Sequence, residues 1–485
     1  MQRRTKIVAT LGPATDDPEA LERLIRAGCD VVRINFSHGD PDTHSRRIRM
    51  VRAVARELDT DVAVLADLAG PKIRIEHFRE GKVELEAGEP FVLYARANPP
   101  PGDRHGVGVG YHQLAEDVKP GSELLLDDGL MALRVDKVVG DEIHCVVQTS
   151  GSLSDRKGLN LRGGGLSTPG LSEADEADIE RAAEWQVDYL AVSFPRSAED
   201  IEQARSLLRK AGGTAAVVSK IERTEAIENL ESIIEASDAV LVARGDLGVE
   251  IGEAELPGLQ KRIISMSLAQ NRAVITATQM MQSMVDSPIP TRAEVLDVAN
   301  AVIDGTDAVM LSAETAVGRH PARVIEAMGR ICEGAERHVQ AHVPSRMLNV
   351  RAERIDQAIA MAAMITANQV PVKAIIALTE SGSTALWLSR VRSPVPIIAL
   401  SPNRASLRKV RLFQHVQPLF FAPGESSAAD QVTRAVERVR AAGLINDGDR
   451  VILTMGDEQG EMGGTNTLKI LTIGRLEETP QARLL

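Results

Sequence analysis

The sequence predicts an α/β protein built on a TIM-type (β/α)8 barrel, with an all-β lid domain inserted into the barrel and an α/β domain after it. Two observations predict the barrel. Short apolar runs rich in β-branched residues alternate with segments of helical spacing, and polar or charged residues follow nearly every run. A third observation, the loss of this rhythm over residues 72–166 and again after about residue 345, marks the other two domains.

Eight runs have the length and composition of buried strands. They are Lys6–Leu11, Val31–Phe36, Asp61–Ala66, Tyr189–Phe194, Ala215–Ser219, Ala239–Ala243, Ala273–Ala277 and Ala308–Ser312. Helical patterns separate or follow them at Pro18–Ala27, Thr43–Leu58, Glu173–Glu184, Ala198–Lys210, Thr224–Ala236, Leu256–Gln270, Arg292–Ile303 and Pro321–Val339. Eight such units close naturally into a barrel whose chemistry belongs to the carboxyl ends of the strands.

The connection after the third strand is much longer than the others. Residues 72–166 hold turn dipeptides such as Asp128-Gly129 and Gly140-Asp141 between short alternating runs, which is typical of a small β domain. The runs are Lys82–Leu85, Phe91–Tyr94, Glu123–Leu126, Leu133–Val138 and Glu142–Gln148. Because the insertion lies at the catalytic mouth of the barrel, we expect a movable lid, the alternative being a fixed decoration.

The C-terminal part has its own strand–helix series. A helix at Arg354–Asn368 leads into short strands at Ala374–Leu378, Ile397–Leu400, Gln417–Phe421, Arg450–Thr454 and Leu468–Ile473, which predicts a mostly parallel sheet. The predicted domains are therefore barrel residues 1–71 and 167–345, lid residues 72–166, and a C-terminal α/β domain of residues 346–485.

Composition limits the function classes. Hydrophobic residues make up 44% and charged residues 26% of the 485 positions, as in ordinary globular proteins. The net charge of −12 argues against a nucleic-acid partner, and no run of about 18 apolar residues is present to span a membrane. Cys29, Cys145 and Cys332 are far apart and outside any CxxC pattern, and no signal-peptide pattern opens the chain. We therefore expect reduced thiols in a soluble, cytoplasmic protein.

Two charged clusters follow neighbouring strands in the β–α–β unit of residues 215–250. Lys220 and Glu222 come after the first strand, and Asp246 comes after the second. Residues two apart on a strand share a direction, so Lys220 and Glu222 should point the same way. Glu222 and Asp246 can then converge as oxygen ligands of a hard divalent cation, with Lys220 beside it. The alternative is a structural ion pair at a strand end.

The other strand ends add polar side chains of the same kind. They are Arg33, Asn35, Ser37 and His38; Asp67, Lys72 and Arg74; Thr276, Thr278 and Gln279; and Ser312, Glu314 and Thr315. Arginine, lysine and a divalent cation at one mouth suit a multiply anionic, phosphorylated substrate. Any one of these residues alone is more simply an ordinary residue of the barrel rim.

Several segments together resemble the pyruvate kinase family over essentially the whole chain and in order. They are KIVATLGPAT, VVRINFSHG, GPKIR, DRKGLNL, VVSKIERTEAIENL, LVARGDLGVEI, ITATQMMQSM and PTRAEVLDVANAVIDGTDAVMLSAETAVG. The SKIE and ARGDLG segments are highly specific to that family. The resemblance implies the same three-domain architecture and phosphoryl transfer from phosphoenolpyruvate to ADP, giving pyruvate and ATP. A metal-dependent lyase or aldolase on the same barrel, and a non-catalytic metabolite-binding relative, stay open as alternatives.

Roles follow from the resemblance position by position. Glu222 and Asp246 would ligate Mg²⁺ or Mn²⁺, and Lys220 would stabilise the phosphoryl group in flight. The catalytic set is Lys220, Thr278 and Arg33, and the substrate set is Arg33, Lys220, Ala243, Arg244, Gly245, Asp246 and Thr278. The nucleotide set is Asn35, His38, Arg74 and Lys157, and Lys157 would arrive with the lid. The family motif GETAKG reads AETAVG here, so no role is carried over to Val317.

The chain departs from potassium-dependent relatives at one motif. Those enzymes carry GPEIR where this chain has Gly70-Pro71-Lys72-Ile73-Arg74. Their potassium site corresponds to Asn35, Ser37, Asp67, Leu68 and Lys72. A lysine in place of the glutamate reverses the local charge, so we expect that potassium is not required, unless Lys72 points to solvent.

The C-terminal domain carries a candidate effector site. Thr379-Glu380-Ser381-Gly382-Ser383-Thr384 follows a strand and precedes a helix, where hydroxyls and amides can hold a phosphate, and the glycine-rich segment Gly456–Asn466 would close over it. An ordinary N-cap turn explains the same pattern. The resemblance favours a sugar-phosphate or nucleotide effector and a homotetramer.

Overall fold

The structure is a computed structural model that describes residues 3–338, 352–422, 424, 427–457 and 463–474. Its residue contacts divide into two compact units. The first holds residues 1–34, 42–65 and 280–485, and the second holds residues 35–41 and 66–279.

Eight parallel strands close into a barrel in the order β1-β16-β15-β14-β13-β12-β3-β2. Their bounds are β1 Lys6–Thr10, β2 Val31–Asn35, β3 Ala63–Asp67, β12 Tyr189–Val192, β13 Ala216–Ile221, β14 Ala239–Ala243, β15 Ala273–Ala277 and β16 Ala308–Leu311. Nearly every residue of these strands is buried, as expected for parallel strands covered on both faces. The predicted α/β barrel is confirmed; β14 and β15 have the predicted bounds, and the other strands differ from them by one or two residues at one or both ends.

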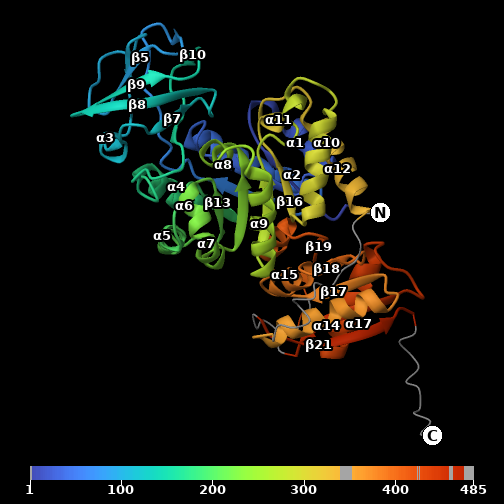
Figure 1. Cartoon of the computed structure of the whole chain (residues 1–485). Coiled ribbons are helices and arrows are strands. Elements are labelled where there is room, and N and C mark those ends of the chain that lie inside the picture. Colours follow the sequence, from blue (N-terminus) through green and yellow to red (C-terminus); the bar gives the residue numbers. More distant parts are fainter. Residues whose placement is uncertain (1–2, 339–351, 423, 425–426, 458–462, 475–485) are drawn as a thin grey trace. The chain divides into compact units, whose positions relative to one another are not determined.

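Helices cover the barrel strands in each unit. In the first unit these are α1 Pro18–Arg26, α2 Pro41–Glu57, α10 Arg292–Asp304, α11 Ala313–Ala316 and α12 Pro321–Glu336. In the second they are α4 Glu173–Glu184, α5 Ala198–Lys210, α6 Thr224–Glu228, α7 Leu230–Ala236, α8 Arg244–Ile251 and α9 Leu256–Ala269 (Figure 1). The helix predicted over Thr224–Ala236 is divided at Asn229, and α8 was not in the predicted series. Short 3-10 turns lie at Pro13–Thr15 and Gln282–Val285.

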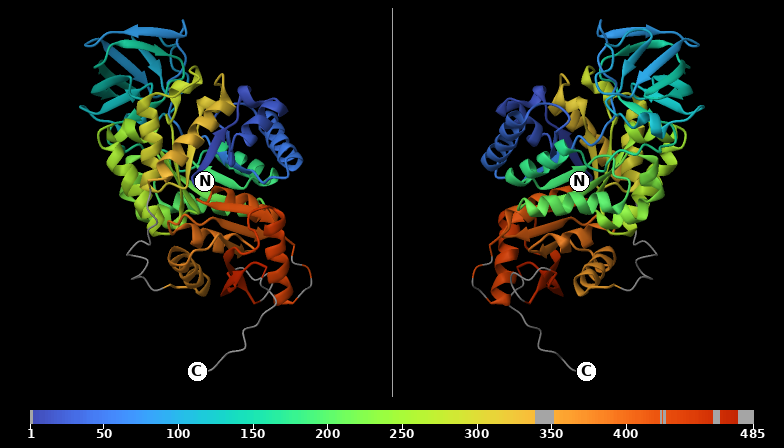
Figure 2. Two further views of the ribbon diagram at one scale, coloured as in Figure 1. Left: turned by 90° about the vertical axis from the view of Figure 1, so that its right-hand side faces the viewer. Right: turned by 90° about the vertical axis from the view of Figure 1, so that its left-hand side faces the viewer.

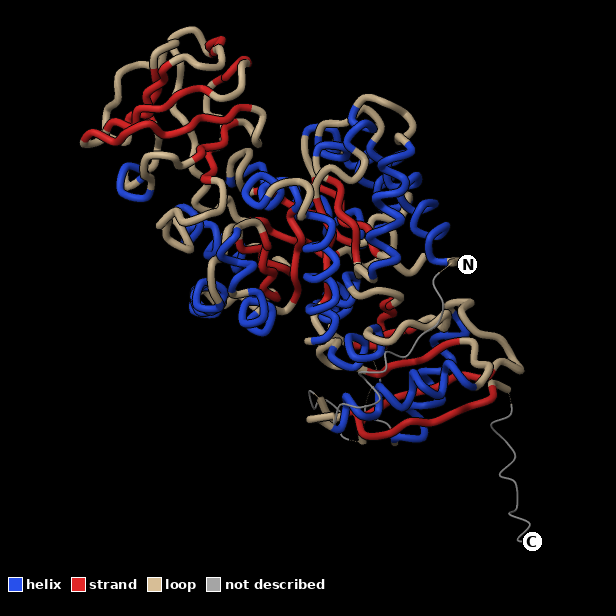
Figure 3. The backbone as a smooth tube through the Cα atoms, in the orientation of Figure 1, coloured by secondary structure: helices blue, strands red, loops and turns tan. Residues whose placement is uncertain are grey.

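The residues after β3 form a mostly antiparallel β structure in the second unit, in which β5 and β6 are the parallel pair. One sheet pairs β10 Gly151–Ser154 with β4 Lys82–Leu85, and a second has the order β11-β7-β8-β9-β5-β6. The bounds of that sheet are β5 Pro90–Tyr94, β6 Gly106–Gly108, β7 Glu123–Leu126, β8 Met131–Val139, β9 Glu142–Val147 and β11 Leu159–Leu161, with α3 at Leu114–Asp117. Alternate side chains of these strands build a separate core around Phe91, Leu93, Leu124 and Val135. Figure 3 shows the backbone of these strands in red, joined by tan loops.

The C-terminal domain, in the first unit, is a five-stranded sheet in the order β19-β18-β17-β20-β21. Its strands are β17 Ala374–Leu378, β18 Ile397–Ser401, β19 Val416–Phe420, β20 Arg450–Gly456 and the antiparallel β21 Thr465–Thr472. The helices α14 Ile355–Gln369 and α15 Ser383–Ser389 pack on one face and α17 Ala428–Ala441 on the other, giving three layers (Figure 2). Shorter turns of helix are α16 Arg404–Lys409 and a 3-10 segment at Val410–Leu412.

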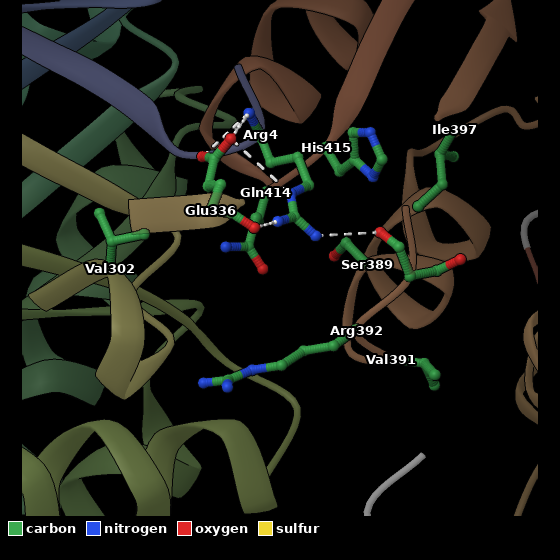
Figure 4. A pocket seen from close by; sticks show the side chains of 10 residues that line it. Arg4, Val302, Glu336, Ser389, Val391, Arg392, Ile397, Gln414 and His415 are labelled. Atoms are coloured by element: carbon green, nitrogen blue, oxygen red, sulfur yellow. Dashed lines mark hydrogen bonds and ion pairs between the residues drawn. The ribbon is translucent and has the colours of Figure 1, made fainter. Parts of the chain in front are cut away.

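Within the first unit, the N-terminal segment is bound to α12 and to the C-terminal domain. The amide of Arg4 donates to the carboxylate of Glu336 at 2.9 and 3.0 Å (Figure 4). The Thr5 amide donates to the same carboxylate at 2.7 Å, and the Arg4 side chain donates to the Ser393 carbonyl at 3.4 Å. Asp307, at the start of β16, forms a buried ion pair with Arg390. These contacts fix the C-terminal domain to the start of the first barrel strand.

Candidate active site

Lys220 and Glu222 lie at the carboxyl end of β13. This strand pairs in parallel with β14, with Lys220 opposite Leu241 and Ile221 opposite Val242. The side chains of Lys220 and Glu222 meet, with Nζ and Oε1 2.9 Å apart, while Ile221 between them is fully buried. The predicted common direction of the two side chains is therefore confirmed.

The ammonium of Lys220 has three acceptors around it, which we call the lysine socket: Asp67, Ser193 and Glu222. The distances from Nζ are 3.2 Å to Asp67 Oδ1, 2.6 Å to Ser193 Oγ and 2.9 Å to Glu222 Oε1. The socket residues are at most 2% exposed and Lys220 is 9% exposed. Two carboxylates and a hydroxyl therefore surround the buried ammonium and offset the cost of removing its charge from water.

Glu222 is held on both oxygens. Its second oxygen, Oε2, accepts a hydrogen bond of 2.9 Å from the amide of Phe194. Burial raises the pKa of Glu222 above its usual range, Lys220 opposes that shift, and the carboxylates of Asp246 and Asp67 add to it. The neighbourhood therefore carries three carboxylates that repel one another and favour added positive charge.

Asp246 is partnered by Lys72. Lys72 Nζ lies 2.8 Å from Asp246 Oδ1 and 3.9 Å from Asp128 Oδ1, and Asp246 stands in the first turn of α8. The lysine of the GPKIR motif therefore points into the site rather than to solvent. Its ammonium offsets the negative charge of Asp246, one of the two predicted metal ligands.

The residues present fit a cation that is shared with a substrate. Among the described residues, no three His, Cys, Asp or Glu side chains are grouped to hold a metal ion by themselves. Mg²⁺ is commonly held by one or two carboxylates, with substrate phosphates and water filling its other positions. Glu222 and Asp246 supply such a pair. The ammonium of Lys220 forms an ion pair with Glu222, and that of Lys72 forms one with Asp246.

Thr278 lies at the amino end of α8. Its hydroxyl accepts a 2.9 Å hydrogen bond from the Gly245 amide and donates to the carbonyl of Ala277 at 2.7 Å. Thr278 has φ of 68°, a rare conformation for a β-branched residue and one that clusters at functional sites. The guanidinium of Arg244 donates to the carbonyls of Ala277 and Thr278 at 3.0 and 2.7 Å, so it stabilises this turn.

The predicted nucleotide residues of the second unit contact other protein groups of that unit. Asn35 Nδ2 lies 3.2 Å from His38 Nδ1, and Asn35 Oδ1 accepts from the Ser37 amide at 3.1 Å. Arg74 Nη1 donates to the carbonyl of Arg156 at 3.0 Å, and Lys157 Nζ lies 2.7 Å from Asp127 Oδ1. Arg33 belongs to the first unit, where its Nη1 donates to Thr10 Oγ1 at 3.1 Å.

Three further predicted residues of the first unit form hydrogen bonds with other protein groups: Ser312, Glu314 and Thr315. The two oxygens of Glu314 accept from the amides of Met281 and Ser312 at 3.1 and 2.7 Å, and the Thr315 hydroxyl donates to the Thr10 carbonyl. Val317, to which the sequence assigned no role, is 57% exposed.

The predicted effector segment forms a turn capped by its own hydroxyls. The amide of Gly382 donates to Thr379 Oγ1 at 3.0 Å, and the amide of Ser383 donates to Ser381 Oγ at 3.4 Å. The hydroxyls of Thr384 and Thr465 lie 2.8 Å apart. In the predicted closing segment Gly456–Asn466, residues 458–462 lie outside the described residues.

Sequence reasoning missed Ser193 and Phe194. Both were included in a strand predicted to run to Phe194, whereas β12 ends at Val192 and Phe194 takes a φ of 57°. A serine followed by an aromatic residue at a strand end carries no pattern of its own. The available signal was their place directly after a barrel strand, where polar side chains gather at the mouth.

None of the helices that the structure describes is long and apolar enough to cross a membrane.

Comparisons with known proteins agree on one family. The family model for the pyruvate kinase barrel domain matches residues 2–325, and the model for the pyruvate kinase alpha/beta domain matches residues 357–471. Pyruvate kinase II of Salmonella typhimurium is 52% identical over 97% of this chain and 99% of its own length. A pyruvate kinase of Haemophilus influenzae is 48% identical over 96% and 97%, and one of Staphylococcus aureus is 41% identical over 97% and 81%. With two domain models in chain order and near-complete coverage of relatives, this chain belongs to the pyruvate kinase family.

Proposed function

We infer that the protein transfers the phosphoryl group of phosphoenolpyruvate to ADP, giving pyruvate and ATP, the last step of glycolysis. The observation that carries this inference is the buried Lys220 ammonium beside the Glu222 and Asp246 carboxylates, in a chain of this family. The family implies dependence on a divalent metal, and we propose Mg²⁺ or Mn²⁺ as the ion.

Some residues of the site bind the divalent cation, and others stabilise negative charge on the phosphoryl group. We assign Glu222 and Asp246 to the cation, which when bound supplies positive charge to the anionic groups of the substrate. Lys220 neutralises charge on the phosphoryl group as its bond to the enol oxygen breaks and a bond to an oxygen of ADP forms. Arg33 holds the same phosphoryl group.

The second half of the reaction is a proton transfer. The enolate left by phosphoryl transfer must take a proton on its methylene carbon to become pyruvate. Thr278, with its hydroxyl beside the Gly245 amide, is assigned to the relay that delivers this proton. The amides of Ala243–Asp246, at the start of α8, bind the substrate carboxylate.

Nucleotide binding is assigned to Asn35, His38, Arg74 and Lys157. Lys157 belongs to the inserted β structure, residues 72–166, which we propose to act as a lid that brings it to ADP. Lys157 Nζ lies 2.7 Å from Asp127 Oδ1, and we propose that the ammonium exchanges this carboxylate for the phosphates of ADP when the nucleotide binds.

Potassium independence is proposed from Lys72. A potassium ion about 4 Å from an ammonium is repelled by roughly 4 kcal/mol at an effective dielectric constant of about 20. The contact of Lys72 with Asp246 supports a lysine that supplies its own positive charge to the site. The site then functions without a bound potassium ion at the corresponding positions, which are Asn35, Ser37, Asp67 and Leu68.

Regulation and assembly are proposed from the family. We assign Thr379–Thr384 to a sugar-phosphate or nucleotide effector and propose a homotetramer located in the cytoplasm. The hydroxyl-rich turn supports a phosphate site, although the same hydroxyls already cap their own amides.

A single assay tests the activity. Formation of pyruvate from phosphoenolpyruvate and ADP, coupled to lactate dehydrogenase, is measured with Mg²⁺, with Mn²⁺ and with a chelator. We expect turnover that needs both substrates and the divalent ion. A lyase or aldolase would consume phosphoenolpyruvate or pyruvate without ADP, and a non-catalytic relative would bind the substrates without turnover.

A further inference from the structure

We propose that Ser193 is a positioning residue for phosphoryl transfer, whose hydroxyl fixes the ammonium of Lys220 in the lysine socket. With Phe194 it forms what we call the β12 corner, which holds Lys220 by a side chain and Glu222 by a backbone amide. The inference rests on the proposed function and deepens it.

The hydrogen bonds of Ser193 have a fixed direction. A hydroxyl has one proton to donate and two lone pairs to accept with. Ser193 Oγ donates its proton to the Leu68 carbonyl at 2.7 Å, which is shorter than its 3.4 Å distance to Asp67 Oδ1. With the proton engaged, a lone pair faces Lys220 Nζ at 2.6 Å. Ser193 therefore acts as an acceptor and holds the ammonium at one point between β12 and β3.

The charge of the socket explains why this acceptor is neutral. Asp67 and Glu222 already place two carboxylates at 3.2 and 2.9 Å from Lys220 Nζ. A third carboxylate would repel the trianionic substrate and weaken the positive field on the phosphoryl group. A hydroxyl gives the ammonium a hydrogen bond without adding negative charge.

The β12 corner is held rigidly by its surroundings. Phe194 has a left-handed φ of 57°, which for a bulky residue persists only where packing enforces it. A Cβ on Gly70 would lie 2.6 Å from Ser193 Cβ and 2.8 Å from Phe194 Cδ2, so the backbone of Gly70 lies directly against the corner. Ser193 is 1% exposed. The corner is therefore a preorganised support for two functional side chains on the next strand.

The test compares two chemical steps in Ser193→Ala and Ser193→Cys. One readout is kcat and KM for ATP formation. The other is exchange of pyruvate methyl protons with solvent, a step assigned above to the Thr278 relay and not to Lys220. Losing a hydrogen bond to a charged group should lower kcat for ATP formation about ten- to a hundredfold. The KM for phosphoenolpyruvate and the exchange rate should each stay within about threefold of wild type. Ser193→Thr, which keeps the hydroxyl, should recover most of the rate.

Ser219→Ala is the matched control. Ser219 is also fully buried, precedes Lys220 on β13, and its hydroxyl has no hydrogen-bond partner among the described residues. It should leave both steps unchanged.

Two results would overturn the inference: unchanged ATP formation in Ser193→Ala and Ser193→Cys, or equal losses in both steps that follow a fall in Tm. If Ser193→Thr does not fold, the Ala, Cys and Ser219 variants still decide between these results. If the wild type makes no ATP from phosphoenolpyruvate, the proposed function fails and this inference fails with it. An active wild type with an insensitive Ser193 removes the inference alone.

Discussion

The ammonium of Lys220 is the residue-scale centre of the site. Lys220→Met keeps much of the length and apolar stem but removes the charge from the socket of Asp67, Ser193 and Glu222. We expect kcat for ATP formation to fall at least about a hundredfold, because a positive charge aimed at the transferring group is lost. Exchange of pyruvate methyl protons should remain measurable. Near-normal ATP formation in this variant would show that Lys220 has another role.

Lys72 carries the second residue-scale prediction. In sodium- and potassium-free buffer, with tetramethylammonium keeping ionic strength constant, the wild type should be fully active because the Lys72 ammonium already lies 2.8 Å from Asp246. Lys72→Glu should be nearly inactive until potassium is added, since the site then lacks one positive charge. Lys72→Met is the neutral control. Strong stimulation of the wild type by potassium would contradict the proposed potassium independence.

At the level of secondary-structure elements, the segment that follows β3 packs against the β12 corner through Gly70. It has φ of 68°, and an added Cβ would meet Ser193 and Phe194 at 2.6 and 2.8 Å. Gly70→Ala should therefore lower kcat for ATP formation more than tenfold, by displacing the corner that holds Lys220 and Glu222 (about 1.4 kcal/mol per tenfold).

Gly81→Ala controls for backbone strain. Gly81 has a similar left-handed φ of 77°, but a Cβ there meets no atom within 4 Å. Its substitution should cost only the strain, about 1 kcal/mol of stability, and leave kcat unchanged. Equal kinetic effects of the two substitutions would mean that strain, not contact with the corner, explains the loss.

The elements that sequence predicted best are those with strong periodicity and clear ends. β14 and β15, and the helices α4 and α5, have the predicted bounds, because buried strands and capped amphipathic helices have distinct patterns. The common direction of Lys220 and Glu222 was predictable from the period of a strand. The partners of Lys220 and Asp246 were not predictable, because Asp67, Ser193 and Lys72 come from other segments and their contacts depend on tertiary packing.

Local strain explains two further misses. Phe194 and Thr278 take left-handed φ values that neither residue type prefers, so propensity extends β12 too far and gives no sign of the turn at Thr278. Arg244 was predicted in the substrate set, and its guanidinium is engaged by the carbonyls of that same turn. Its role in the substrate set stays a prediction for its backbone amide.

At the scale of the whole molecule, His415 links pH to stability in the first unit. Burial, together with the positive charges of Arg4 and Lys6, lowers the pKa of His415 to about 3. Arg4 is itself paired with Glu336 (Figure 4). The folded state therefore keeps His415 neutral while the unfolded chain takes a proton below about pH 6.5. Stability contributed by the neutral ring is present above pH 6.5 and is lost as pH falls towards 3.

His415→Asn tests this linkage. Asparagine does not titrate and tolerates the φ of 63° at this position. Between pH 7 and pH 5, the free energy of unfolding of the wild type should fall by about 2 kcal/mol more than that of the variant, as measured by urea denaturation. Parallel pH profiles for the two proteins would show that His415 is not the group responsible.

The proposed transfer of a phosphoryl group from phosphoenolpyruvate to ADP is observed directly by ³¹P NMR of the purified protein with both substrates and Mg²⁺. We expect the phosphoenolpyruvate resonance to decline while the γ-phosphate resonance of ATP grows in equal amount. Lys220→Met should show neither change on the same time scale. Release of inorganic phosphate in place of ATP, or an unchanged phosphoenolpyruvate resonance in the wild type, would contradict the proposed transfer.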